Sequence, residues 1–279
     1  MDLNTITEVV RPPQRDRLPS WRAGDALLAG GTWLFSEPQP HLSRLIDLTS
    51  LNWPAIEIDD RGLRIAATCT IAQLEAASLP PQWLAAPLIG QCCRAFLASF
   101  KIWNTATVGG NICMSLPAGP MISLVSALDG VGVIWTRDGH EMRVPIIEFI
   151  LGSRANVLKP GDILRQVDLP ASTLSRRTAF RQISLAPVGR SGALVIGTFA
   201  PNGDAFDLTV TAATARPIRL SFPGLPDEKA LAQRIARDIP DALYFDDVHG
   251  DPRWRKHVTP VLAEEIRQEL AQHAADGAR

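Results

Sequence analysis

The sequence has no excess of charge of either sign, since 28 Lys and Arg residues stand against 29 Asp and Glu residues and give a net charge of −1. Surfaces that bind nucleic acid are strongly basic, so we expect no nucleic-acid partner. No apolar run approaches the ~18 residues that a membrane span needs, and no basic, apolar leader opens the chain. We therefore expect no transmembrane segment and a cytoplasmic protein.

Cysteine is also scarce, with only Cys69, Cys92, Cys93 and Cys113 in 279 residues. Four cysteines at irregular spacing do not form a disulfide framework in a chain of this length, which fits a reducing compartment. The close pairs that hold iron–sulfur clusters are missing, and the five histidines lack the spacing of a zinc pair. We expect no bound metal, and no nucleophile motif indicates a catalytic side chain.

Two nucleotide-binding signatures are absent as well. No G-x-G-x-x-G sequence opens a helix, and there is no phosphate-binding loop of the G-x-x-x-x-G-K-[ST] type. A dinucleotide, if one binds, is therefore not bound on a Rossmann unit.

Hydrophobic residues make up 46% of the chain, enough for a sizeable core. Alternating apolar residues and turn signals predict hairpins over 56–65 and 131–144, and further strands over 27–29, 45–48, 191–198 and 206–211. Helical spacing predicts helices over 83–100, 227–237 and 258–272, and a capping box at Thr70 predicts another helix start. Strand clusters separated by single helices favour an α+β fold over a doubly wound sheet.

Two glycine segments are the strongest chemical signal. The first comprises Leu27, Leu28, Ala29, Gly30, Gly31, Thr32, Trp33 and Leu34, and the second comprises Thr107, Val108, Gly109, Gly110 and Asn111. A Gly-Gly pair lets backbone N–H groups approach an anion closely, so two such segments could hold one diphosphate from two sides. Each pair taken alone is more often an ordinary turn.

In these segments the chain resembles the FAD-binding medium subunit of molybdenum hydroxylases, the family of carbon monoxide dehydrogenase and xanthine dehydrogenase. The similarity rests on Ala29-Gly30-Gly31-Thr32 and on Thr107-Val108-Gly109-Gly110-Asn111. It continues through 45–48, 66–70 and 159–164, and reaches the segment 247–255 near the end of the chain.

The resemblance implies an FAD-binding fold of the vanillyl-alcohol oxidase-like (PCMH) type with a C-terminal α/β subdomain. It implies an FAD-binding domain over 1–169, in two subdomains of about 1–53 and 54–169. The C-terminal domain of the molybdopterin dehydrogenase flavoprotein type would cover 170–279.

The resemblance also implies which residues hold the cofactor. Residues 27–34 would surround the diphosphate of FAD, mainly with backbone N–H groups, and 107–111 would close the other side. Leu97 and Ile102 match positions that line the cofactor, Leu164 matches an aliphatic contact, and Arg181 stands where the family usually has a lysine near the flavin ring.

The implied function is that of an FAD-carrying electron-transfer subunit. It would take electrons from the clusters of a small [2Fe-2S] subunit, supplied by a large molybdopterin-binding subunit, and pass them to an external acceptor. Trp103, Trp254, Arg253 and Arg255 are candidates for contacts with these partners, or else core and surface residues. Two alternatives remain: an assembly subunit that has lost flavin, which Pro120 at a usual Asp position motivates, and a stand-alone flavin oxidase.

Overall fold

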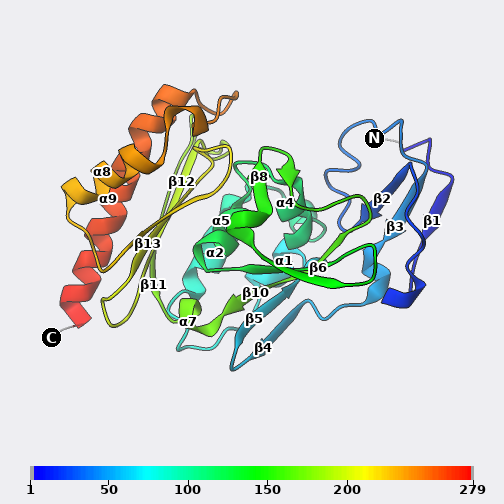
Figure 1. Cartoon of the computed structure of the whole chain (residues 1–279), viewed down its shortest axis with the longest axis horizontal. Coiled ribbons are helices and arrows are strands. Elements are labelled where there is room, and N and C mark those ends of the chain that lie inside the picture. The colour runs from blue at the N-terminus through cyan, green and yellow to red at the C-terminus, as the bar shows by residue number, and fades with distance from the viewer. Residues whose placement is uncertain (1–2, 278–279) are drawn as a thin grey trace.

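The computed structural model describes residues 3–277 and contains three larger sheets arranged in sequence along the molecule (Figure 1). The first is a small parallel sheet in the order β1-β3-β2, with strands Glu8–Val10, Arg44–Asp47 and Asp25–Leu28. The 3-10 turns η1 (Arg15–Arg17) and η2 (Leu48–Leu51) flank it. The expected strands at 27–29 and 45–48 thus lie side by side.

The second sheet is antiparallel and has the order β4-β5-β10-β6-β7. Its strands are Ile56–Asp59, Gly62–Ala66, Ile163–Pro170, Val131–Trp135 and Glu141–Pro145. Both expected hairpins are therefore confirmed, and β10 joins them by pairing with β5 on one side and β6 on the other. A small ribbon of β8 (Ile150–Gly152) and β9 (Ala155–Asn156) precedes β10.

Helices cover this second sheet on the side of the four-stranded sheet. They are α1 (Ile71–Glu75), α2 (Ala86–Ala95), α3 (Phe100–Trp103), α4 (Val108–Met114) and α5 (Pro120–Ala127), with the short α6 (Ile146–Phe149) and α7 (Ala171–Leu174) at its edges. The capping box at Thr70 is present, with both of its hydrogen bonds to Gln73 formed.

The helix expected over 83–100 is shorter than the apolar spacing indicated. Helix α2 starts at Ala86 because Pro87 lacks an N–H group and is accommodated only in a first turn. Trp83 belongs to the turn that precedes the helix, where its N–H donates to the carbonyl of Pro80, and its side chain is buried. At the other end the chain leaves the helix after Ala95, and Leu97 takes a left-handed conformation with φ of 42°.

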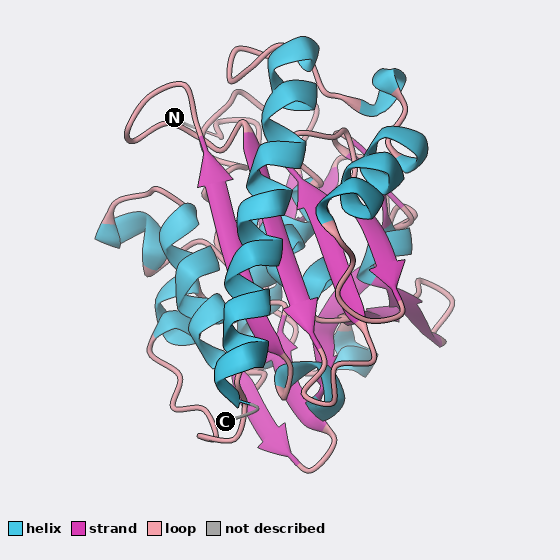
Figure 2. Cartoon of the chain, turned by 90° about the vertical axis from the view of Figure 1, so that its left-hand side faces the viewer, coloured by secondary structure: helices cyan, strands magenta, loops and turns pink. Residues whose placement is uncertain are grey.

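The third sheet is an antiparallel meander of β11 (Arg177–Ile183), β12 (Ala193–Phe199), β13 (Phe206–Thr211) and β14 (Ile218–Phe222). Figure 2 shows the long helix α9 (Pro252–Gly277) lying along its outer face, beside α8 (Glu228–Asp238). The turn η3 (Asp241–Leu243) lies between the two helices.

Helix α9 begins six residues before the expected start at Val258. The side chain of Asp251 accepts hydrogen bonds from the N–H groups of Arg253 and Trp254, and Pro252 occupies the first helical position. Arg255, one of the candidate partner contacts, is only 1% exposed and is therefore an interior residue. None of the helices in the described range combines the length and hydrophobicity needed to cross a membrane.

Two large hydrophobic cores hold these layers together. One lies between the second sheet, its helices and the inner face of the third sheet; the other lies between the third sheet and helices α8 and α9. The small parallel sheet is attached through a minor cluster of Leu48, Leu51 and Ile163, joined by Leu27 and Trp135. The first glycine segment and a cavity lie at the boundary around this cluster.

Candidate functional site: two glycine segments and an adjoining cavity

The first glycine segment leaves the parallel sheet at the end of β2 and turns sharply. Gly31 has φ of +68°, and the N–H of Phe35 then donates to the carbonyl of Gly31 at 2.8 Å. Within residues 3–277, the five backbone N–H groups from Gly30 to Leu34 have no hydrogen-bond acceptor. Consecutive unpaired amides in a turn form an anion-binding nest, so this segment can hold a phosphate group.

Gly30 packs directly against the chain that leads into the second glycine segment. A Cβ atom added to Gly30 would lie 2.0 Å from the carbonyl oxygen of Thr105 and 3.1 Å from the Cα of Ala106. No side chain fits there, because the neighbour is backbone and cannot rotate away. The fold therefore brings the two glycine segments together, although more than seventy positions separate them in the sequence.

The second glycine segment is the first turn of a helix rather than a loop. Thr107 is the N-cap of α4, and its hydroxyl oxygen accepts the N–H of Gly110 at 3.0 Å. The N–H of Val108 donates to Cys69 and that of Gly109 to Ala67. The backbone N–H groups of residues 108–111 are thus paired within the protein, unlike those of 30–34.

The two glycines of this helix face different surroundings. A Cβ on Gly109 would lie 2.4 Å from the Cβ of Ala67, whereas a Cβ on Gly110 would meet only the Thr107 hydroxyl within 4 Å. Gly109 therefore serves close packing, whereas the space beside Gly110 is open except for the Thr107 hydroxyl, 2.9 Å from the added Cβ. Asn111 borders this space; its side-chain oxygen accepts the N–H of Met121 at 3.1 Å, and its amide nitrogen has no acceptor in the described part of the chain.

Leu97 and Ile102 lie before the second segment and expose their side chains. Leu97 is 42% exposed and Ile102 37%, and Phe100 between them is 72% exposed. The N–H of Ala106 donates to the carbonyl of Ile102 at 2.7 Å, which connects this apolar group to the contact of Gly30 with Thr105. Large apolar side chains exposed in this way can contact a flat ligand.

Leu164 and Arg181 are not brought to the glycine segments. The Leu164 side chain is 3% exposed and points into the main core from β10. Arg181 lies on β11 and forms ion pairs with Glu265 at 2.8 Å and Glu269 at 2.7 Å, both on α9. Because α9 covers the outer face of the third sheet, the Arg181 side chain is directed away from the central layer.

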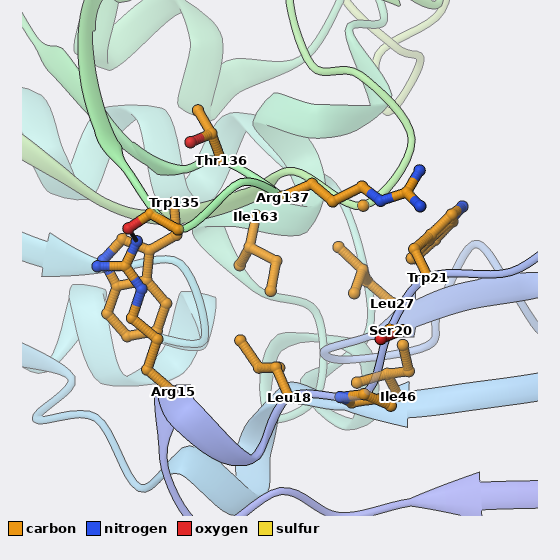
Figure 3. Close-up of a pocket in the computed structure, with 13 residues that line it drawn as sticks. Arg15, Leu18, Ser20, Trp21, Leu27, Ile46, Trp135, Thr136, Arg137 and Ile163 are labelled. Carbon is orange, nitrogen blue, oxygen red and sulfur yellow. Dashed lines mark hydrogen bonds between the residues drawn. The ribbon is translucent and has the colours of Figure 1, made fainter.

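A cavity of about 260 Å³ adjoins the start of the first glycine segment (Figure 3). Leu27 belongs to both, and the cavity lies between the parallel sheet and the β6–β7 hairpin. Its walls combine apolar side chains, two indoles and two guanidinium groups, contributed by Leu18, Leu27, Ile46, Ile163, Trp21, Trp135, Arg15 and Arg137. Such a lining suits a flat, partly apolar group that carries negative charge.

The two arginines of the cavity are held differently. Arg15 stacks on Trp135, with 4.6 Å from its Cζ to the ring centroid, and donates to the carbonyl oxygens of Gly139 and His140. Arg137 extends toward Trp21, and its guanidinium has no hydrogen-bond or carboxylate partner in the described range (Figure 3). The sequence did not reveal this cavity, because its residues come from four separate segments without a shared motif.

No group of three or more His, Cys, Asp or Glu side chains in the described residues could hold a metal ion. Burial raises the pKa of Cys69, Cys93 and Cys113 to about 12. These thiols are therefore protonated at neutral pH and do not act as nucleophiles.

Comparison with known proteins gives one family match. Residues 16–172 match the family described as the FAD binding domain in molybdopterin dehydrogenase. A xanthine dehydrogenase from Oryza sativa subsp. japonica is 28% identical over 127 residues, which are 41% of this chain and 9% of that protein. The chain thus spans about a tenth of the length of this curated relative.

Several solved structures share the fold. Quinoline 2-oxidoreductase from Pseudomonas putida 86 matches with a TM-score of 0.71 and 19% identity, covering 90% of both chains. Carbon monoxide dehydrogenase from Hydrogenophaga pseudoflava matches with a TM-score of 0.72 and 18% identity, covering 88% of this chain and 89% of that chain. The reconstituted CO dehydrogenase from Oligotropha carboxidovorans matches with a TM-score of 0.73 and 20% identity, covering 88% of this chain and 89% of that chain.

Proposed function

Because the chain belongs to the family of FAD-binding domains of molybdopterin dehydrogenases, we propose that it is the FAD-carrying electron-transfer subunit of a heteromeric molybdenum hydroxylase. FAD is the cofactor of this family, and the match extends over more than half of the chain, residues 16–172 of 279. The single observation that carries the proposal at the level of residues is the row of five unpaired N–H groups from Gly30 to Leu34.

Features at both ends of the first glycine segment support the proposal that FAD binds there. The amides of 30–34 would hold the diphosphate, and Asn111 would donate its free amide hydrogens from the side of the second segment. The adenosine half would enter the cavity beside Leu27, where Trp21 and Arg137 offer an aromatic face and a cation. Leu97 and Ile102 would contact the flavin half with their exposed side chains.

Two residues from the sequence analysis take other roles in this proposal. The side chain of Ile163 lines the cavity while that of Leu164 points to the core, so β10 would contact the cofactor through Ile163. Arg181 already compensates two glutamates of α9, and we leave it outside the site.

The domain division follows from the same assignment. We propose an FAD-binding domain of the vanillyl-alcohol oxidase-like (PCMH) type over 1–169, with subdomains of about 1–53 and 54–169, and a C-terminal domain over 170–279. In support, each of these three parts contains its own sheet.

Bound FAD supplies one- and two-electron redox chemistry, and the protein's part is to bind the cofactor, orient it and limit solvent access. No side-chain acid or base is required for that role. The electrons would come from a small [2Fe-2S] subunit and, before that, from a large molybdopterin-binding subunit, since the four cysteines of this chain are separately buried or half-buried and do not form a cluster-binding set.

Reconstitution with FAD tests the proposal. The purified chain should bind one FAD and show a flavin spectrum, and acid precipitation should release all of the yellow colour, because no reactive thiol is available for attachment. The isolated flavoprotein should not bleach anaerobically with aldehydes, N-heterocycles or carbon monoxide. Colourless protein after reconstitution would favour an assembly subunit, and rapid bleaching without other subunits would favour a stand-alone oxidase.

A further inference from the structure

Trp33 of the first glycine segment stacks against an arginine from a distant turn. The Cζ atom of Arg154 lies 5.4 Å from the centroid of the Trp33 ring, within the range of a cation–π contact. Trp33 contributes one of the five unpaired amides, so its ring is fixed to the proposed diphosphate site by its own backbone. Within residues 3–277 it is the only cation–π contact that involves either glycine segment.

The turn that carries Arg154 is anchored to the helix that begins with the second glycine segment. The N–H of Arg154 donates to the carbonyl of Ser115 at 2.9 Å, and the Asn156 side chain donates to Cys113 O at 2.8 Å and Ser115 Oγ at 3.0 Å. Ser115 caps the C-terminal end of α4. Arg154 therefore connects, through its turn and α4, the second glycine segment to Trp33 in the first.

None of the ion pairs among the described residues involves Arg154. Its side chain is exposed and has no carboxylate within 4 Å in the described range. Arg154 also has φ of 59°, a left-handed conformation that a residue with a side chain adopts at a cost. Gly or Asn would adopt this backbone conformation at a lower cost, yet the sequence has an arginine at this position.

We propose that Arg154 and Trp33 form a clasp beside the unpaired amides of 30–34 and that this clasp slows the release of FAD. This inference rests on the proposed function. The stacked guanidinium would act as a positioning group: it would tie the first glycine segment to the turn anchored on α4, and it would place a cation near the unpaired amides of that segment. Opening of the stack would then precede cofactor release.

Three substitutions at the clasp test it: Trp33→Leu, Arg154→Asn and Arg154→Lys. Asn tolerates the left-handed turn, so Arg154→Asn removes the guanidinium without adding backbone strain. We expect Trp33→Leu and Arg154→Asn each to raise the FAD dissociation rate roughly fivefold, the gain of one such contact, and the double variant to show no more than the larger single effect. Arg154→Lys keeps the charge but stacks less well, so its FAD dissociation rate should lie between those of wild type and Arg154→Asn.

A matched control exists elsewhere in the chain. Arg234 lies 5.5 Å from the Phe222 ring, far from the glycine segments on α8 and β14, and Arg234→Ala should leave FAD release unchanged. The rate is measured from the recovery of flavin fluorescence after dilution, with the melting temperature of the apoprotein as a check on folding. A wild-type rate in Arg154→Asn, with FAD still bound, would overturn the clasp alone. A wild-type protein that does not bind FAD would overturn the proposed function and the clasp with it.

Discussion

Gly30 and Thr105 approach each other so closely that a Cβ on Gly30 would lie 2.0 Å from the carbonyl oxygen of Thr105. This contact joins a turn at the end of a parallel strand to the segment that enters α4. It also holds the amides of 30–34 with their N–H groups unpaired. The close approach of two backbones, rather than any side-chain contact, therefore assembles the proposed cofactor site.

Replacement of Gly30 by alanine should damage both the fold and the site. The added methyl group meets backbone atoms, so the segments must separate, at a cost of about 2 kcal/mol in the free energy of unfolding. FAD affinity should fall together with stability. Urea denaturation of the apoprotein and FAD titration measure the two effects, and normal stability in Gly30→Ala would contradict the contact.

Substitutions at the two adjacent glycines of α4 should differ in their effects on stability and on FAD binding. Gly109→Ala overpacks against Ala67 and should lower stability by about 1–3 kcal/mol. Gly110→Ala places its methyl group 2.9 Å from the Thr107 hydroxyl, which must shift slightly, and has no other neighbour within 4 Å; the loss of apoprotein stability should therefore be smaller than in Gly109→Ala. If the cofactor passes there, Gly110→Ala, and more strongly Gly110→Val, should weaken FAD binding about tenfold or more. Equal FAD affinity in Gly110→Val and wild type would remove this position from the site.

The ion pair of Asp25 and Arg44 should make the parallel sheet sensitive to acid. Arg44 donates to both carboxylate oxygens, at 2.7 and 2.6 Å, and the Asp25 side chain is fully buried. These hydrogen bonds hold the pKa of Asp25 below its usual value despite burial. The stabilisation is therefore present above the unfolded pKa of about 3.9 and is lost as pH falls through the lower folded value.

Asp25→Asn should accordingly cost about 3 kcal/mol at pH 7, because the buried Arg44 guanidinium loses its buried carboxylate partner. The difference from wild type should shrink as pH falls below about 4. Urea denaturation across this range checks the prediction, with the exposed Asp16→Asn as the control. A constant difference at all pH values would show that the carboxylate charge is not responsible.

Arg255 should be essential for the C-terminal part of the chain. Its guanidinium donates to the carbonyl oxygens of Gly250, Gly192 and Ala212 and pairs with Asp247. Arg255→Met leaves these acceptors buried and unpaired, and we expect a loss of about 3 kcal/mol or more. The exposed neighbour Arg253→Met is the control and should change stability by less than about 0.5 kcal/mol. Similar stability in the two variants would contradict the interior role of Arg255.

The four cysteine thiols should be unreactive in the folded protein. Burial holds the pKa of Cys69, Cys93 and Cys113 at about 12, so almost no thiolate exists at pH 8. A thiol-specific disulfide reagent should modify none of the four cysteines within minutes under native conditions and all four in urea. Rapid reaction of one thiol in the native state would contradict the prediction, because it would show that this thiol is accessible and readily ionised.

Local features of the fold were readable from the sequence because local chemistry determines them. The alternation at 56–65 and 131–144, and the capping box at Thr70, specify hairpins and a helix start within a few residues. Helix ends were less predictable: Pro87 delays α2, and the cap by Asp251 advances α9, because one residue with a special backbone role outweighs the apolar spacing.

The sequence by itself determined the two glycine segments, the α+β class and the family resemblance, since these depend on residue type and spacing alone. Only the tertiary structure decided which amides stay unpaired. The N–H groups of α4 find Cys69 and Ala67, residues of another segment, while those of 30–34 find no acceptor in the described chain. Likewise the surroundings of Arg181 and Arg255 depend on distant partners, since Glu265 lies 84 positions from Arg181 and Gly192 lies 63 positions from Arg255. Whether a polar group is free or satisfied depends on what folding places opposite it, and the sequence around that group does not carry this information.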